Sequence, residues 1–203
     1  MKFVSMALLI SLAAVSHSER FITINMGRKV PYRSVKLNSL SDIHDFELGS
    51  KSLGFAFGNS FDGEVVYEND GNRKRTSLDL AYNLNDPLIG YGPGFSAGIR
   101  DVANESINGR EIFAVFTHHL GNVPTHVQNV PTMVTYGFLH GREGMKMFVG
   151  AQFPFSEHIS LVMEHNSHDL IGGLELRPVP DGSLRWLHKQ GAIMVQVSYL
   201  QRF

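Results

Sequence analysis

The stretch His165-Asn166-Ser167-His168 contains the residue types that could carry out covalent chemistry. A histidine that accepts the proton of a serine hydroxyl turns that serine into a nucleophile, and a carboxylate usually orients the histidine. In an extended strand His165 and Ser167 share one face, because side chains alternate between the two faces. Glu164 falls on the opposite face, and Glu175 is not obviously placed to be the third member. We therefore expect no catalytic residues here.

The other histidines and the glycine-rich stretches do not form the pattern of a metal or cofactor site. Of the ten histidines, His118 and His119 are adjacent and so point to opposite faces, and no histidine or carboxylate recurs at ligand spacing. The chain has no cysteine, which removes thiolate ligands and disulfides. The glycines of residues 90–94 lack the strand-to-helix context of a phosphate-binding loop. We expect neither a metal nor a cofactor.

Charged residues of both signs recur on the polar faces of the predicted strands, and we take them as the candidate site. They are Asp79, Arg100, Lys146, Glu164, Glu175 and Arg177. The last three belong to two strands joined by a turn at residues 166–169, so an ion-pair network between them is geometrically natural. Such residues could line a ligand-binding or conducting lumen, or they could satisfy one another as structural partners. We favour the second interpretation, because interior charges in small barrels commonly pair.

The elements that must position these charges are short strands. In residues 76–84 the even-numbered positions hold Thr, Leu, Leu, Tyr and Leu, whereas Ser, Asp and Asn hold odd-numbered ones. Similar alternation recurs to the end of the chain, between turn-forming clusters such as residues 69–72, 141–144 and 180–182. The pattern predicts an all-β fold in which residues 51–203 form an antiparallel up-and-down meander. If it closes as a membrane barrel, we expect 10–12 strands.

The region before residue 51 differs in character. Residues 1–18 combine a short positive start, an apolar stretch and small residues suited to cleavage, which is typical of a secretory signal peptide. Residues 19–50 form a poorly patterned N-terminal segment, in which Phe21–Ile24 could be a strand and Leu40–Glu47 a helical turn capped by Ser41.

The composition narrows the class of protein. With 18 basic and 19 acidic residues and a net charge of -1, the chain has no basic excess for a phosphate backbone, so we expect no nucleic acid partner. After the leader, no apolar run approaches the roughly 20 residues that a membrane-spanning helix needs. The length fits one domain and excludes neither a soluble β-sandwich nor a membrane barrel.

The final strand favours the membrane barrel. Residues 192–203 alternate up to the last residue, with Tyr199 and Phe203 on the apolar face, and they are long enough to cross a bilayer. A terminal aromatic that closes an alternating strand resembles the signal read by the outer-membrane barrel assembly machinery, although Gln201 stands where that signal usually has an apolar residue. We therefore expect an outer-membrane location, with membrane lipid and that machinery as partners.

The order of signals from Gly94 to Phe203 resembles the YjbH-like outer-membrane family, which is associated with capsule and exopolysaccharide. The similar pieces are residues 95–101, 148–154, 161–165 and 173–178. The chain departs from the family at Thr117-His118-His119 and at His165, and it lacks the proline-rich N-terminal signature. The resemblance implies a short or divergent member, a non-enzymatic barrel that serves exopolysaccharide production or export together with export components, and it carries over no catalytic residue.

Two alternatives remain. The His165-x-Ser167 pair resembles the site of outer-membrane lipid A deacylases, which would make the protein a membrane-embedded hydrolase. A soluble periplasmic β-sandwich or barrel that serves as a binding module would instead direct the apolar faces of the strands toward a shared core. The direction of these apolar faces separates the soluble fold from the membrane barrel.

Overall fold

The computed structural model describes residues 23, 31, 33–58, 60–88, 92–106, 109–120 and 131–203. In this part of the chain it contains twelve β-strands and no helix. The strands are β1 Ser34–Asp42, β2 Gly49–Phe57, β3 Phe61–Asn69, β4 Lys74–Asn85, β5 Gly94–Arg100, β6 Glu111–Leu120, β7 Thr132–Gly141, β8 Gly144–Pro154, β9 Ile159–His165, β10 Leu170–Val179, β11 Gly182–Lys189 and β12 Ala192–Arg202. Nothing described here is a helix long and apolar enough to span a membrane.

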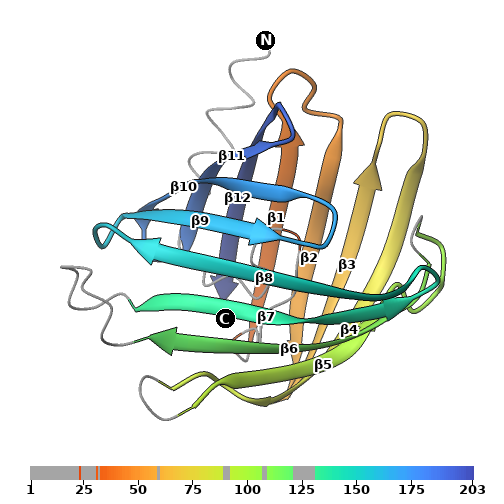
Figure 1. Ribbon diagram of the computed structural model, residues 1–203, viewed down its shortest axis with the longest axis horizontal. Helices are drawn as coiled ribbons and strands as arrows, with labels where there is room; N and C mark the ends of the chain where they lie inside the picture. Colours follow the sequence, from red (N-terminus) through yellow and green to blue (C-terminus); the bar gives the residue numbers. More distant parts are fainter. Residues whose placement is uncertain are drawn as a thin grey trace.

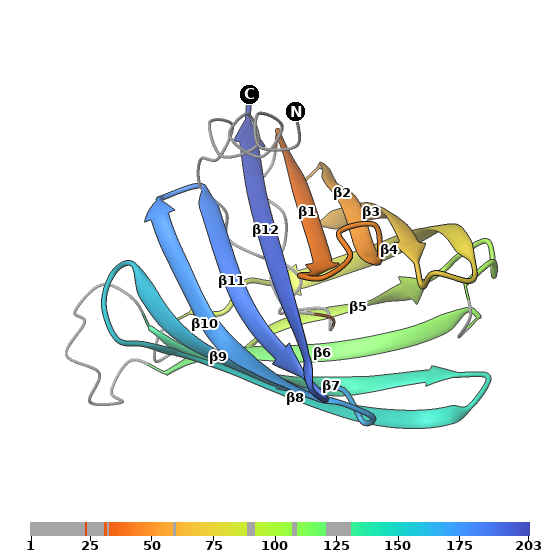
Figure 2. The same ribbon diagram turned by 90° about the horizontal axis from the view of Figure 1, so that it is seen from above.

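The strands form one closed antiparallel barrel. Each strand pairs with the next one along the chain, as Figure 1 shows, so the prediction of an up-and-down meander with 10–12 strands is confirmed. The barrel closes where β1 pairs with β12, with Leu37 opposite Tyr199 and Ser41 opposite Val195. Figure 2 shows these two strands side by side. We call the end at which β1 begins and β12 finishes the terminal end, and the opposite one the distal end.

The barrel begins earlier than its predicted start at residue 51. Strand β1 lies within the segment expected to be poorly patterned, and it supplies the strand that closes the barrel. The suggested helical turn at Leu40–Glu47 is wrong, because β1 continues to Asp42 and a hydrogen-bonded turn follows, in which the Glu47 N–H donates to the Asp45 carboxylate at 3.0 Å. The predicted signal peptide, residues 1–18, and the suggested strand at Phe21–Ile24, apart from Thr23, lie outside the described residues.

The distal turns show why the meander reverses where it does. Gln190 and Gly191 form the two-residue link between β11 and β12 with φ values of 47° and 90°. Positive φ at both positions is the geometry of a type I′ turn, whose twist matches that of the strands it joins. At the terminal end, the register of β10 and β11 shifts between Leu176 and Val179, on either side of Pro178. A proline has no N–H to donate to a strand ladder and is tolerated at such a bulge.

The apolar faces of the strands point out of the barrel. Leu80 on β4 and Val149 on β8 are 38% and 47% exposed, whereas the neighbouring Asp79 is 5% exposed and Glu164 on β9 only 1%. A soluble barrel would have the opposite arrangement, with its aliphatic side chains inside. The outward direction therefore excludes a shared apolar core formed by these faces, and it identifies the surface that meets acyl chains in a membrane barrel.

Part of the interior is nevertheless apolar. A buried cluster on the inner wall combines side chains from β1 and from each of the strands β6 to β11. It consists of Leu40, Phe113, Val115, Met133, Leu139, Phe148, Val162, Ile171 and Leu187. Glycines make room for its two aromatic rings, since a Cβ at Gly98 would lie 2.6 Å from the ring of Phe113 and one at Gly137 would lie 2.7 Å from that of Phe148. The interior is therefore not lined by polar groups alone, and these apolar side chains narrow the lumen.

Candidate functional site

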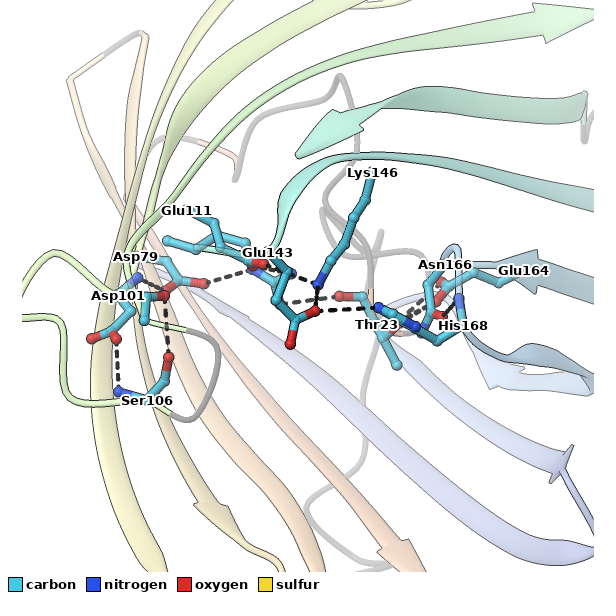
Figure 3. Close-up of polar contacts among 12 residues, drawn as sticks. Thr23, Asp79, Asp101, Ser106, Glu111, Glu143, Lys146, Glu164, Asn166 and His168 are labelled. Carbon is cyan, nitrogen blue, oxygen red and sulfur yellow. Dashed lines mark hydrogen bonds and ion pairs between the residues drawn. The ribbon is translucent and has the colours of Figure 1, made fainter. Parts of the chain in front are cut away.

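Two clusters of charged and polar side chains, on the inner wall and at the distal mouth of the barrel, together contain all six candidate residues. The distal cluster comprises Asp79, Arg100, Glu111, Glu143, Lys146 and Glu164, near the ends of β5 and β9 and the starts of β6 and β8. The Glu175 cluster comprises Gln152, Glu175, Arg177, Arg185 and Gln196, on β8, β10, β11 and β12. Figure 3 shows most of the distal cluster.

Arg100 is central to the distal cluster because it lies between two carboxylates. Its Nε is 3.7 Å from an oxygen of Asp79 on β4, and its Nη1 is 3.7 Å from an oxygen of Glu111 on β6. The strand register brings these residues together, since Arg100 is directly opposite Glu111. Glu111 was not among the predicted residues, although it precedes the outward-facing Ile112 and its inward direction follows from the same alternation.

Lys146 extends the distal cluster to the turn between β7 and β8. Its Nζ lies 2.7 Å from a carboxylate oxygen of Glu143 and 4.0 Å from one of Glu111. The hydrogen bond and charge of Lys146 lower the pKa of the Glu143 carboxyl below its usual value. Figure 3 shows the Glu143 carboxylate between Lys146 and His168, whose Nε2 is 3.8 Å away. The distal mouth thus carries both signs of charge in close contact.

Asp101 fixes the loop that follows β5, beside the distal cluster. Its backbone N–H donates to Asp79 at 2.9 Å, and its carboxylate accepts hydrogen bonds from the N–H groups of Glu105 and Ser106 at 2.9 and 2.7 Å. Burial acts to raise the pKa of the Asp101 carboxyl, but these hydrogen bonds outweigh it and the pKa is lowered. The residue has a φ of 51°, the left-handed region that aspartate tolerates better than most residues. The loop is therefore held by the charged form of Asp101.

The Glu175 cluster is more deeply buried. The Glu175 carboxylate accepts hydrogen bonds from Nε of Arg185, from Nε of Arg177 at 2.5 Å and from the Gln152 amide at 2.9 Å. Arg185 also donates to the Gln196 side chain at 3.1 Å, and both Arg185 and Glu175 are 1% exposed. A carboxylate in this setting is stable only with such partners. The cluster ties β8, β10, β11 and β12 together from the inside.

The predicted network of Glu164, Glu175 and Arg177 forms only in part. Arg177 does pair with Glu175, but Glu164 lies opposite Ile171, whereas Glu175 lies opposite Ser160, which precedes Glu164 by four residues on β9. This separation is about 13 Å along the strand. Glu164 instead accepts hydrogen bonds from Thr23, at 3.0 and 3.1 Å from the backbone N–H and also from the hydroxyl.

The serine and histidine of the suggested hydrolase site do not form a nucleophile and base. The Ser167 hydroxyl donates to the carbonyl of Met147, and the contact between Ser167 and His165 is a backbone N–H donating to Nδ1 at 3.3 Å. Glu164 points into the barrel while His165 is exposed on the outside. Among the described residues, no three histidines, cysteines or carboxylates are grouped as metal ligands would be.

The exterior carries aromatic side chains on neighbouring strands. Phe95, Phe116 and Tyr136 lie in a row across β5, β6 and β7, with ring centroids 4.9 and 5.7 Å apart. Phe61 and Tyr82 form a similar contact between β3 and β4, at 4.9 Å. Aromatic girdles of this kind flank the apolar band of outer-membrane barrels.

Comparison with solved structures supports the same architecture. A KdgM porin structure covers 84% of this chain and 99% of its own, with a TM-score of 0.54 at 12% identity. A second structure, of KdgM porin in complex with disordered oligogalacturonate, gives 0.53 at 11% identity over 84% of this chain and 99% of its own. No family model matches the chain, and no curated protein sequence matches it. The closed twelve-strand barrel with an apolar exterior is that of an outer-membrane protein.

Proposed function

We propose that the protein is a non-enzymatic outer-membrane channel for polar solutes. The observation that carries the proposal is the division of side chains between the two faces of the closed barrel, with carboxylates and guanidinium groups inside and aliphatic groups outside. A membrane barrel with this division has a polar lumen, which is the property a solute pathway requires. The apolar cluster on the inner wall makes that pathway narrow, so the conductance is expected to be low.

The solutes that suit this lumen are oligosaccharides. Their hydroxyl groups can donate to carboxylates such as Glu111 and accept from Arg100 and Arg177, whose side chains are 20% and 23% exposed. The fold resemblance to KdgM porin, which has been solved with oligogalacturonate, is consistent with a sugar of this kind. We extend the proposal to a role in exopolysaccharide production or export with dedicated export components, and to a divergent member of the YjbH-like family.

Reconstitution into planar lipid bilayers tests the channel proposal. The purified, folded protein should produce small, discrete current steps in KCl, and an added acidic oligosaccharide should interrupt them in a concentration-dependent way. Folding is verified separately by a gel on which the unheated barrel migrates differently from the boiled one. If the protein is folded by this criterion and shows no current steps, the proposal fails.

Ion selectivity tests whether the distal cluster lines the pathway. The cluster contains both signs of charge, so the wild-type channel should discriminate weakly between K⁺ and Cl⁻. Replacing Arg100 and Lys146 by glutamine leaves the carboxylates in place and should shift the reversal potential toward cation selectivity. The control, Lys74→Gln, changes an exposed residue at the start of β4 and should have no effect. An unchanged reversal potential in the double variant would place the pathway elsewhere.

We further propose that Tyr199 and Phe203 are read by the barrel assembly machinery. Tyr199 is on β12, opposite Leu37, and Phe203 follows that strand with 80% of its surface exposed. The N–H of Phe203 donates to the carbonyl of Arg33 at 2.9 Å, so the end of the chain is held beside the closing strand. Phe203→Ala should lower the amount of folded barrel in the outer membrane without changing its synthesis. Equal amounts of wild type and variant would contradict this role.

A further inference from the structure

Thr23 is bound inside the barrel, far from its neighbours in sequence. Its backbone N–H and its hydroxyl donate to the carboxylate of Glu164, and the Asn166 amide donates to its hydroxyl at 3.2 Å. On its other side, the Thr23 carbonyl accepts a hydrogen bond from Nη2 of Arg100 at 3.3 Å. Figure 3 shows Thr23 beside Glu164 and Asn166. Every polar group of this one residue is therefore engaged by the distal cluster and the turn next to it.

These contacts connect parts of the wall that are not neighbours. Arg100 ends β5 and Glu164 is near the end of β9, and three strands lie between them around the barrel. A residue that contacts both must extend over the space enclosed by the wall. Because Glu164 is 1% exposed, its carboxylate depends on internal donors, and Thr23 supplies two of them.

We infer that Thr23 is an internal peg that narrows the distal mouth, and that releasing it increases the flow of ions. The inference rests on the proposed channel function. In this inference Glu164 and Asn166 bind Thr23. Arg100 has two roles, because it forms ion pairs with the carboxylates of the cluster and donates a hydrogen bond to the Thr23 carbonyl. A solute with hydroxyl groups could compete for the same donors and acceptors, which would couple its entry to release of the peg.

The contact itself can be tested without any measurement of current. The chain has no native cysteine, so Thr23→Cys combined with Asn166→Cys gives a single pair of thiols. A short, reducible bis-methanethiosulfonate reagent should link this pair in folded protein in membranes and alter its migration on a non-reducing gel. Thr23→Cys combined with Ser183→Cys, at the terminal end of β11, is the control and should not link. If the first pair fails to link while both thiols remain reactive, the peg does not occupy the site and the inference is overturned.

The effect on conduction is then measured in planar bilayers. The linked Thr23→Cys/Asn166→Cys protein should have a conductance no higher than that of the wild type. Reductant, which breaks the link, should raise this conductance. Thr23→Pro removes the N–H and the hydroxyl that Glu164 binds and should raise the conductance severalfold, whereas Thr23→Ser keeps both donors and should match wild type. If the Pro variant conducts like wild type, the peg does not restrict the pathway.

The two proposals can fail separately. If the cysteine pair links but the folded wild type does not conduct, the channel proposal is wrong, although Thr23 is in its site. If the wild type conducts and the linked, reduced and Pro forms all conduct equally, the channel proposal stands and the peg is refuted.

Discussion

Removing Arg185 should strongly destabilise the barrel. The side chain is 1% exposed, donates to Glu175 and Gln196, and faces a carboxylate that is equally buried. Removing one partner of a buried ion pair typically costs about 3–5 kcal/mol, because the remaining charge lacks compensation. In Arg185→Met, Glu175 still has Arg177, so we expect the lower part of this range, about 3 kcal/mol. This is a change of roughly two orders of magnitude in the folding equilibrium.

The assay is denaturant unfolding of the barrel in lipid vesicles, followed by the fluorescence of Trp186, the single tryptophan of the chain. The matched control is Arg202→Met, because Arg202 is 59% exposed and pairs with Asp181 at 3.3 Å. An exposed pair of this kind contributes about 0–1 kcal/mol. In the double variant Arg185→Met/Glu175→Leu, the buried charge is gone as well, so the loss should be smaller than the sum of the two single losses. A loss below about 1 kcal/mol for Arg185→Met would refute the account of this cluster.

Three further predictions follow from single contacts. Gly173→Ala should lower the unfolding free energy by about 1–3 kcal/mol, because the added Cβ would lie 1.9 Å from the Trp186 carbonyl oxygen. In the same unfolding assay Gly172→Ala should be tolerated, because its Cβ would lie 3.6 Å from the nearest atom, the Val162 carbonyl oxygen. The pKa of the Asp101 carboxyl is lowered in the folded protein, so its contribution to stability is present above the unfolded-state pKa of about 3.9 and is lost as the pH falls through the lower folded value. Asp101→Asn should therefore make unfolding less sensitive to acid. Ser167→Ala should leave the acylation of lipid A unchanged by mass spectrometry, because its hydroxyl is bound to a backbone carbonyl, and a changed acylation pattern would restore the hydrolase hypothesis.

Alternation predicted the strands wherever the inward and outward side chains differ in polarity. The predicted stretch 76–84 lies within β4, and its Asp79 points inward as expected. Strand β1 was missed because its two faces do not differ in polarity in this way. The apolar Leu40 points into the barrel, whereas the polar Ser39 lies on the outward face. A strand whose two faces are similar can be recognised only through its partners, which for β1 are β2 and β12.

Alternation predicted that the six charged side chains point inward, but it did not predict which partners they contact. Alternation indicates that a charge points inward, but the pairing register decides which charge it meets, and register depends on turns and bulges. Arg185 could have been found, because it lies between the outward-facing Leu184 and Trp186. Thr23 carries no such signal, because its partners lie 77 to 143 positions away in the sequence.

The central claim is that the apolar faces of the strands contact lipid, and Trp186 tests it without any substitution. Its side chain is 55% exposed on the outside of β11, opposite Leu174 and Val195 on the adjacent strands. In vesicles that contain lipids brominated on the acyl chains, its fluorescence should be strongly quenched, and aqueous iodide should have little effect. Efficient quenching by iodide, with no effect of the brominated chains, would show that this face of the barrel meets water and would contradict the membrane account.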